Sequence, residues 1–125
     1  MSDIRSTLEA LCEAFNAHDL DAIMARFADD CVLEMPRGTK PYGTRHEGKH
    51  SVREGLAGRF AGLPDVHYAD GQHFVDEQAQ TGMSKWRLTG TGRDGRKVDV
   101  HGCDFYTFRA GKVLKKDSYW KIVEP

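Results

Sequence analysis

Three side chains in the C-terminal third of the sequence could transfer a proton: His101, Asp104 and Asp117. Their surroundings alternate between apolar and polar residues, which is typical of β-strands. An imidazole titrates near neutral pH, and two adjacent carboxylates raise the pKa of one of them until they share a proton. We therefore predict acid–base chemistry here. Two alternatives stay open. His101 is a neutral residue in the wall of a pocket, or Lys85 lies in one cross-strand row with Asp104 and Asp117 and neutralises their charge.

Two short motifs point to other chemistry, but their contexts do not support it. Residues 46–50 read His-Glu-Gly-Lys-His, the spacing of a helical zinc site, yet a glycine interrupts the motif and no third ligand stands out. Residues 90–95 match a dinucleotide-binding glycine motif, but a strand follows where that motif needs a helix. We therefore expect His46 and His50 to be solvated residues near the start of a helix, and residues 90–95 to form a β-hairpin. We expect neither a metal nor a cofactor.

The elements that position these residues follow from hydrophobic periodicity. Apolar residues at helical spacing predict two N-terminal helices, with Asp19 as the N-cap of the second, and a third helix farther on. From Val66 the period changes to two. The helices are predicted at residues 4–15, 20–27 and 49–61, a Pro- and Gly-rich loop at 36–43, and strands at 66–74, 79–90, 98–108 and 112–123. Helices followed by an antiparallel meander indicate an α+β fold.

Two turns, Asp94-Gly95 and Ala110-Gly111, are predicted to be two-residue hairpin loops. Counting from them assigns each strand residue to a face of the sheet, because a slip of one residue exchanges the faces. The apolar face, which we expect to line a pocket, contains Trp86, Leu88, His101, Cys103, Phe105, Ser118, Trp120 and Ile122. The opposite face contains Lys85, Arg87, Asp104, Tyr106, Asp117, Tyr119 and Lys121. A bulge between Gly102 and Asp104 would reverse the direction of the aspartates.

Length and charge limit the class of protein. The 125 residues and 14.0 kDa suit a single domain over residues 1–125. Lysine plus arginine number 18 against 19 acidic residues, so a net charge of -1 offers no basic surface for nucleic acid or anionic lipid. We see no apolar run that would suit a membrane span or a signal peptide, and the three widely spaced cysteines are expected to be reduced. We expect a cytoplasmic protein.

Three stretches of the sequence resemble a known superfamily. Similarity to ketosteroid isomerases is found in residues 19–38, which end in Glu34-Met35-Pro36-Arg37-Gly38, in Asp104-Phe105-Tyr106-Thr107-Phe108 and in Ser118-Tyr119-Trp120. The chain is thus identified as a member of the nuclear transport factor 2-like superfamily, which includes the SnoaL-like polyketide cyclases. The resemblance implies a cone-shaped, curved antiparallel sheet wrapped around N-terminal helices, an internal pocket and a homodimer. It also implies that Asp104 is the acid of an oxyanion hole and Trp120 an aromatic pocket wall.

The departures from the isomerases decide the expected function. Met35 stands at the position of their general base and Leu11 at that of their oxyanion tyrosine, so steroid isomerisation is disfavoured. The base of the cyclases aligns with Ser118, next to Asp117. We expect a small apolar or amphipathic carbonyl or cyclic compound to bind, with isomerase, cyclase or hydrolase activity through Asp104, His101 or Asp117; the alternative is a binding or accessory domain without catalysis. The expected pocket residues are Trp86, Phe105, Trp120, Met35, Leu11 and Cys103.

Overall fold

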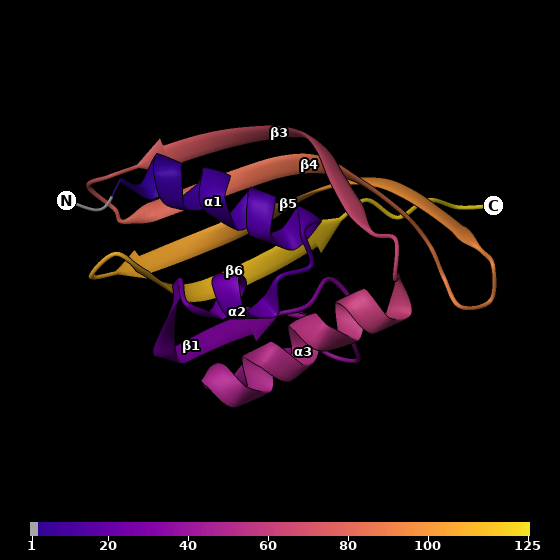
Figure 1. Ribbon diagram of the computed structural model, residues 1–125, viewed down its shortest axis with the longest axis horizontal. Coiled ribbons are helices and arrows are strands. Elements are labelled where there is room, and N and C mark those ends of the chain that lie inside the picture. Colours follow the sequence, from indigo (N-terminus) through magenta and orange to yellow (C-terminus); the bar gives the residue numbers. More distant parts are fainter. Residues whose placement is uncertain (1–2) are drawn as a thin grey trace.

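Within residues 3–125, which the computed structural model describes, three helices lie on one face of a six-stranded sheet (Figure 1). The helices are α1 (Ile4–Asn16), α2 (Leu20–Met24) and α3 (Lys49–Gly62). The strands are β1 (Phe27–Glu34), β2 (Arg45–Glu47), β3 (His67–Asp76), β4 (Thr81–Thr91), β5 (Lys97–Arg109) and β6 (Lys112–Trp120).

The sheet is curved and open, with the strand order β2-β1-β6-β5-β4-β3. Neighbouring strands are antiparallel except β1 and β6, which run parallel. The α+β class and the curved sheet agree with the expectation from the sequence. The sheet is mixed rather than wholly antiparallel, because β1 enters it beside the last strand instead of extending the meander.

The first two helices form where an N-cap precedes an apolar stripe. The Asp3 carboxylate accepts a hydrogen bond from the backbone N–H of Arg5 at 3.0 Å, and that of Asp19 accepts one from Ala22 at 3.1 Å. The N-cap predicted at Asp19 is therefore confirmed. The buried apolar residues of α1 recur every three or four positions, at Ile4, Leu8, Leu11 and Phe15.

The region between α2 and α3 differs from the expectation. Phe27 begins β1, so α2 ends at Met24 and does not reach residue 27. The His-Glu pair of the zinc-like motif lies on β2, and Gly48, with a φ of 86°, turns the chain into α3. His46 is half-buried with Nδ1 3.1 Å from Ser51 Oγ, whereas His50 is exposed on the helix.

The two histidines of this motif therefore do not share a helix face. Across residues 3–125, no group of three or more His, Cys, Asp or Glu side chains has an arrangement that could hold a metal ion. The expectation of two solvated histidines holds for His50 and is wrong for His46.

The β4–β5 hairpin confirms the reading of the glycine motif as a turn, but its loop has three residues instead of two. The backbone N–H of Gly92 donates to the carbonyl of Arg96 at 2.9 Å, and residues 93–95 form the loop between them. The strand pairing is consequently shifted by one residue, and Trp86 lies opposite Gly102.

The β5–β6 hairpin has the predicted two-residue turn followed by a bulge that was not predicted. Arg109 pairs with Lys112, and the turn residues Ala110 and Gly111 have positive φ values of 51° and 78°. The register then shifts, because Phe108 pairs with Val113 while Thr107 pairs with Lys115. One residue of β6, Leu114, is left over, which again displaces the pairing by one.

The first shift turns β5 over relative to β4, and the second turns β5 over relative to β6. The two shifts cancel, so the faces predicted for β4 and β6 relative to each other are kept. The predicted common face of Trp86, Ser118 and Trp120 is therefore right, while the predicted face of the β5 residues is wrong. Asp104 and Tyr106 point toward the helices and are 5% and 2% exposed. The outer face of the sheet instead carries Lys85, His101, Cys103, Phe105, Asp117 and Tyr119. The predicted row of Lys85, Asp104 and Asp117 does not form.

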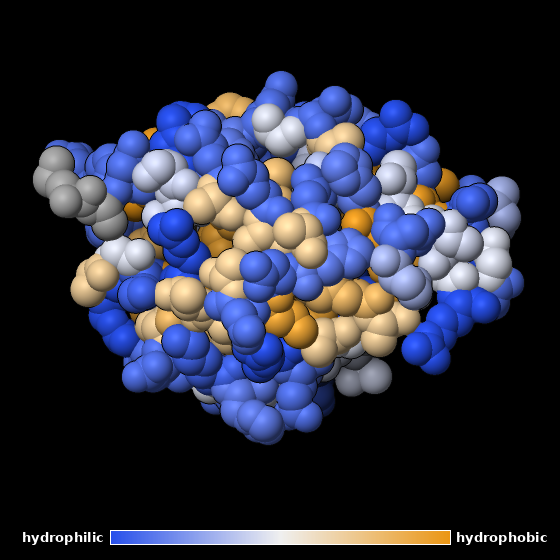
Figure 2. Space-filling view, in the orientation of Figure 1, coloured by the Kyte–Doolittle hydropathy of each residue, from blue (hydrophilic) through white to orange (hydrophobic). Residues whose placement is uncertain are grey.

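Buried apolar side chains fill the space between the helices and the sheet. The larger cluster joins α1, α3 and β1 to the middle of the sheet, and a smaller one surrounds Trp86 and Leu88. Figure 2 shows a mostly hydrophilic surface on the face that bears α1 and α3, with hydrophobic residues visible between the helices. The three cysteines are unpaired, as expected. None of the helices in residues 3–125 is both long and apolar enough to cross a membrane.

Candidate functional site

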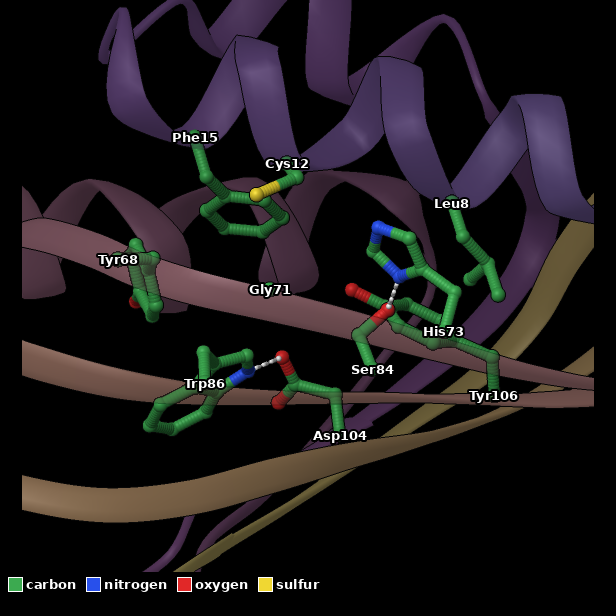
Figure 3. Close-up of a pocket in the computed structure, with 10 residues that line it drawn as sticks. All are labelled: Leu8, Cys12, Phe15, Tyr68, Gly71, His73, Ser84, Trp86, Asp104 and Tyr106. Carbon is green, nitrogen blue, oxygen red and sulfur yellow. Dashed lines mark hydrogen bonds between the residues drawn. The ribbon is translucent and has the colours of Figure 1, made fainter.

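A small cavity lies between α1 and strands β3, β4 and β5 (Figure 3). Its volume of about 20 Å³ has room for roughly one water-sized group. Most of the surrounding side chains carry a polar group, which is uncommon in a protein interior. The lining residues are Leu8, Cys12 and Phe15 from α1, Tyr68, Gly71 and His73 from β3, Ser84 and Trp86 from β4, and Asp104 and Tyr106 from β5.

A bulge in β3 brings Tyr68 and His73 to the cavity together. The two residues are five positions apart, so on a regular strand they would point to opposite faces. The pairing with β4 shifts between Ala69 and Gln72, and Asp70 has a positive φ of 58°. The extra residue places both side chains on the inner face of the sheet.

The end of α1 fixes the position of Tyr68. The side chain of Asn16 donates to the Tyr68 carbonyl at 3.0 Å and accepts from the Tyr68 backbone N–H at 2.8 Å. These two bonds replace strand pairing at the edge of the sheet, since β3 has β4 on only one side. The tyrosine ring also packs edge-on against Trp86, with ring centroids 5.0 Å apart.

Asp104 lies at the base of the cavity in a buried network of charged and polar groups. Its Oδ2 accepts a hydrogen bond from Trp86 Nε1 at 2.9 Å. Its Oδ1 accepts from Lys116 Nζ at 2.9 Å and from Ser118 Oγ at 2.6 Å, and Lys116 Nζ also lies 2.8 Å from Ser118 Oγ. Asp104 and Lys116 are each 5% exposed. The arrangement compensates both buried charges, as a stable interior requires.

His73 is the imidazole that reaches the cavity. Its Nδ1 lies 2.8 Å from Ser84 Oγ, as the dashed line in Figure 3 marks. Burial lowers the pKa of His73, an effect that the charge of Glu9 opposes and that of Arg5 reinforces. The imidazole is therefore neutral near pH 7 and able to accept a proton.

Two tyrosine hydroxyls at the cavity are held in their protonated form. Burial raises the pKa of Tyr68, and the negative charge of Asp104 raises it further. The same two causes raise the pKa of Tyr106 well above its usual range. The thiol of Cys12 behaves likewise, because burial and then Asp104 raise its pKa. Near neutral pH, these groups can donate hydrogen bonds but do not ionise.

The sequence-predicted site residues fall on both faces of the sheet. Asp104 and Trp86 line the cavity, whereas Trp120 lies on the same inner face but near the open end of the sheet. The expectation that His101, Cys103 and Phe105 face inward is wrong, because β5 is turned over. Asp117, which the sequence placed on the outer face, is there, opposite Phe105.

Met35 and Leu11 occupy apolar positions. Leu11 is 1% exposed in the core beneath α1, and Met35 is half-buried against that core at the end of β1. Neither residue lines the cavity among its ten neighbours.

Sequence reasoning missed His73, Tyr68, Tyr106, Ser84 and Lys116. A signal was present for the first two, because Asp70-Gly71 interrupts the predicted strand and an isolated glycine in a strand suggests a bulge. Tyr106 was placed on the wrong face with the rest of β5. Nothing in the local sequence distinguishes Lys116 from the exposed lysines that surround it.

A sequence model described as SnoaL-like domain matches residues 8–115, which is most of the chain. No functionally curated protein matches the sequence.

Several solved structures share the fold. A protein described as a "putative polyketide cyclase" from Xanthomonas campestris pv. campestris has 18% sequence identity and a TM-score of 0.83, covering 94% of this chain and 89% of that one. An NTF2-like protein of unknown function from Burkholderia pseudomallei K96243 has 20% identity and a TM-score of 0.83, covering 97% and 92%. A "putative isomerase" from Bacillus subtilis has 14% identity and a TM-score of 0.78, covering 93% and 84%. Identities this low show a common fold.

Proposed function

Because this chain belongs to the SnoaL-like domain family, we propose that it transfers a proton on a small carbonyl compound at the cavity between α1 and the sheet. The main support is that one cavity combines a neutral imidazole, His73, with two protonated hydroxyls, those of Tyr68 and Tyr106. Proteins of similar fold that are named as a cyclase and an isomerase agree with carbonyl chemistry. The proposed reaction uses side chains alone, without metal or cofactor.

His73 is the proposed base. When its Nδ1 donates to Ser84 Oγ, the lone pair of Nε2 is free to take a proton from the carbon next to the carbonyl group. The electron pair of the broken C–H bond then forms the carbon–carbon double bond of an enolate. Return of the proton to another carbon completes an isomerisation.

Tyr68 and Tyr106 are the proposed donors to the enolate oxygen. Their raised pKa values keep the O–H groups intact, so each can hydrogen-bond an oxygen that gains negative charge. This arrangement supplies the function that the isomerase resemblance assigned to Asp104. Asp104 itself accepts three hydrogen bonds, so we assign it the positioning of Trp86 and Lys116.

The cavity volume limits what can enter. At about 20 Å³ it fits a functional group, on the order of one water molecule in size, and not a steroid. Gly71 is exposed and Cys12 half-buried, so we place the entrance between α1 and β3. We therefore propose that the carbonyl end of a small apolar or amphipathic substrate enters here while its remaining atoms lie at the rim.

Exchange of carbon-bound hydrogen for deuterium tests this function without knowledge of the natural substrate. We expect the protein to accelerate exchange next to the carbonyl of small cyclic ketones in D₂O, followed by proton NMR. His73→Gln should lower the rate about 100-fold or more, the usual contribution of a general base. The rate should also fall as the pH drops toward the pKa of His73, which burial lowers below its ordinary value of 6.5, because the imidazole then binds a proton of its own.

His50→Gln is the matched control, since it removes an exposed imidazole on α3 and should leave the exchange rate unchanged. A His73→Gln protein that retains the full rate would exclude His73 as the base. No acceleration with any of the ketones would count against the reaction itself.

Ligand binding without catalysis is the second candidate. It is favoured by the apolar residues Met35 and Leu11, which the resemblance aligns with the catalytic base and tyrosine of the isomerases. Under this proposal the cavity recognises one polar group of a ligand and performs no reaction. Native mass spectrometry of the purified protein should then show a bound compound that is released unchanged.

We also propose that two copies of the chain associate through the outer face of the sheet. This face exposes aromatic side chains that a monomer would leave in water: Phe74, Phe105 and Tyr119 are 50%, 44% and 56% exposed. Lys115 and Asp117 lie beside them, so a two-fold arrangement can set opposite charges against each other.

A further inference from the structure

A groove far larger than the cavity opens at one end of the molecule. The β4–β5 hairpin, the chain's C-terminus and the C-terminal end of α3 all lie at this end (Figure 1). Strand β6 ends at Trp120, opposite Gly102, so residues 97–100 of β5 extend past it and border the groove. The groove has a volume of about 540 Å³, within the range of small-molecule sites.

Positive charge is concentrated around this groove although the chain as a whole has a net charge of -1. Arg37, Arg96, Lys97 and Lys121 line it. In the described part of the chain, none of these four cations takes part in a salt bridge. Their charges are therefore available to a ligand.

Among the residues that the structure describes, one acidic side chain lines the groove, and it is already engaged. Asp99 pairs with Arg87 in a two-point contact, in which Nε lies 2.8 Å from Oδ1 and Nη2 lies 2.5 Å from Oδ2. Because Arg87 neutralises this carboxylate, the groove keeps its positive character.

A fifth cation, Arg59 on α3, lies directly behind the groove wall. Its guanidinium covers the ring of Trp120, with Cζ 4.4 Å from the ring centroid. Burial is the main cause that lowers the pKa of Arg59; the charges of Tyr68 and Asp104 oppose this lowering, and the charge of Arg37 adds to it. Within residues 3–125, Arg59 has no carboxylate partner at salt-bridge distance.

The unpaired cations that line the groove repel one another, and an anion bound among them would relieve this repulsion. Arginine presents a planar fork that matches a carboxylate. The groove also has an apolar wall, formed by Trp120, Val98 and Val100. An ion without an apolar part would leave this wall in water.

We propose that this groove binds a small organic anion, with its carboxylate against Arg37 and its apolar body against Trp120 and Val98, while Arg59 packs on the Trp120 ring from behind the groove wall. The site is separate from the cavity beneath α1. The proposal for the groove stands whether or not proton transfer takes place in the cavity.

The test compares 1-naphthoate with the uncharged 1-naphthalenemethanol on the ¹⁵N-labelled full chain. The two tryptophans give two indole N–H signals, and Trp120→Phe identifies which is which. Naphthoate should shift the Trp120 signal saturably and leave that of Trp86, whose indole N–H donates to buried Asp104, nearly unchanged. The alcohol should bind at least about tenfold more weakly, because it lacks the charge-assisted hydrogen bonds.

Arg37→Gln should weaken naphthoate binding about tenfold or more. Arg37 is exposed, so this substitution should leave the fold intact. Arg26→Gln removes the same charge from an exposed position that does not line the groove, and should bind like the unmodified chain. The proposal is overturned if the alcohol binds equally well, if Arg37→Gln has no effect, or if naphthoate causes no saturable shift at Trp120.

Discussion

At the scale of single residues, the buried pair of Asp104 and Lys116 contributes both to the stability of the fold and to the electrostatic environment of the cavity. Both residues are 5% exposed and their charged atoms lie 2.9 Å apart, so removing one side chain leaves the other charge without compensation. We expect Lys116→Met to destabilise the protein by about 3–5 kcal/mol, measured by urea unfolding. Lys40→Met, at an exposed lysine in the loop before β2, should change stability by less than about 0.5 kcal/mol.

The double variant Asp104→Leu/Lys116→Met separates charge from packing. It removes both charges, and apolar replacement of a buried pair is often tolerated. We expect it to be more stable than Lys116→Met alone. A double variant that is less stable would mean that Ser118 and Trp86 depend on the carboxylate more than the lysine does.

His73 makes folding stability depend on pH in a predictable direction. Burial lowers the pKa of His73 in the folded state below its ordinary value of 6.5, which applies to the unfolded chain. The unfolded chain therefore binds a proton more readily, and stability present above pH 6.5 is lost as the pH falls toward the folded-state pKa. Thermal unfolding at pH 7.5 and pH 5 should show a smaller loss on acidification in His73→Gln than in the unmodified chain.

The exposed imidazole of His50 provides the comparison for this measurement. His50→Gln removes the same titratable group from the surface of α3 and should preserve the loss of stability on acidification. Equal behaviour of the two variants would mean that burial of His73 does not contribute to the pH dependence.

At the scale of elements, glycine allows the close contact between Trp86 and β5. A Cβ at Gly102 would lie 2.7 Å from the Trp86 ring and 2.4 Å from the carbonyl oxygen of Tyr119, too close for any rotamer change to relieve. Gly102→Ala should therefore destabilise the protein by about 1–3 kcal/mol, the usual range for overpacking.

Gly58 is the matched control, because a Cβ there would meet no atom within 4 Å. It lies inside α3, where alanine is the better helix former, so Gly58→Ala should stabilise the protein by about 0.5–1 kcal/mol. Urea unfolding of both variants checks the prediction. Equal effects of the two substitutions would contradict the proposed contact.

At the scale of the whole molecule, the proposed dimer depends on the outer face of the sheet. Phe105→Glu places a charge among Phe74, Met83 and Tyr119, and burying it in an interface would cost several kcal/mol. We expect sedimentation analysis to show a dimer for the unmodified chain and a monomer for Phe105→Glu. Ala22→Glu adds the same charge at an exposed position of α2, on the helical side, and should remain dimeric. A monomeric unmodified chain would contradict this arrangement.

The sequence by itself determined the helices, the four strands of the meander, the N-cap at Asp19 and the fold class. Each of these depends on local periodicity or on a local turn, and such patterns lie within a few residues. Superfamily membership, inferred from a few short stretches, is borne out by the match over residues 8–115.

Only the tertiary structure decided which residues meet at the site. A third residue in the β4–β5 loop, one extra residue in β6 and a bulge in β3 each reverse a face, and each is selected by long-range pairing. They bring Asp104 to Lys116 and Tyr68 to His73, and they turn His101 and Phe105 outward. The size of the cavity likewise depends on side chains from four separate elements, whose fit no local pattern encodes.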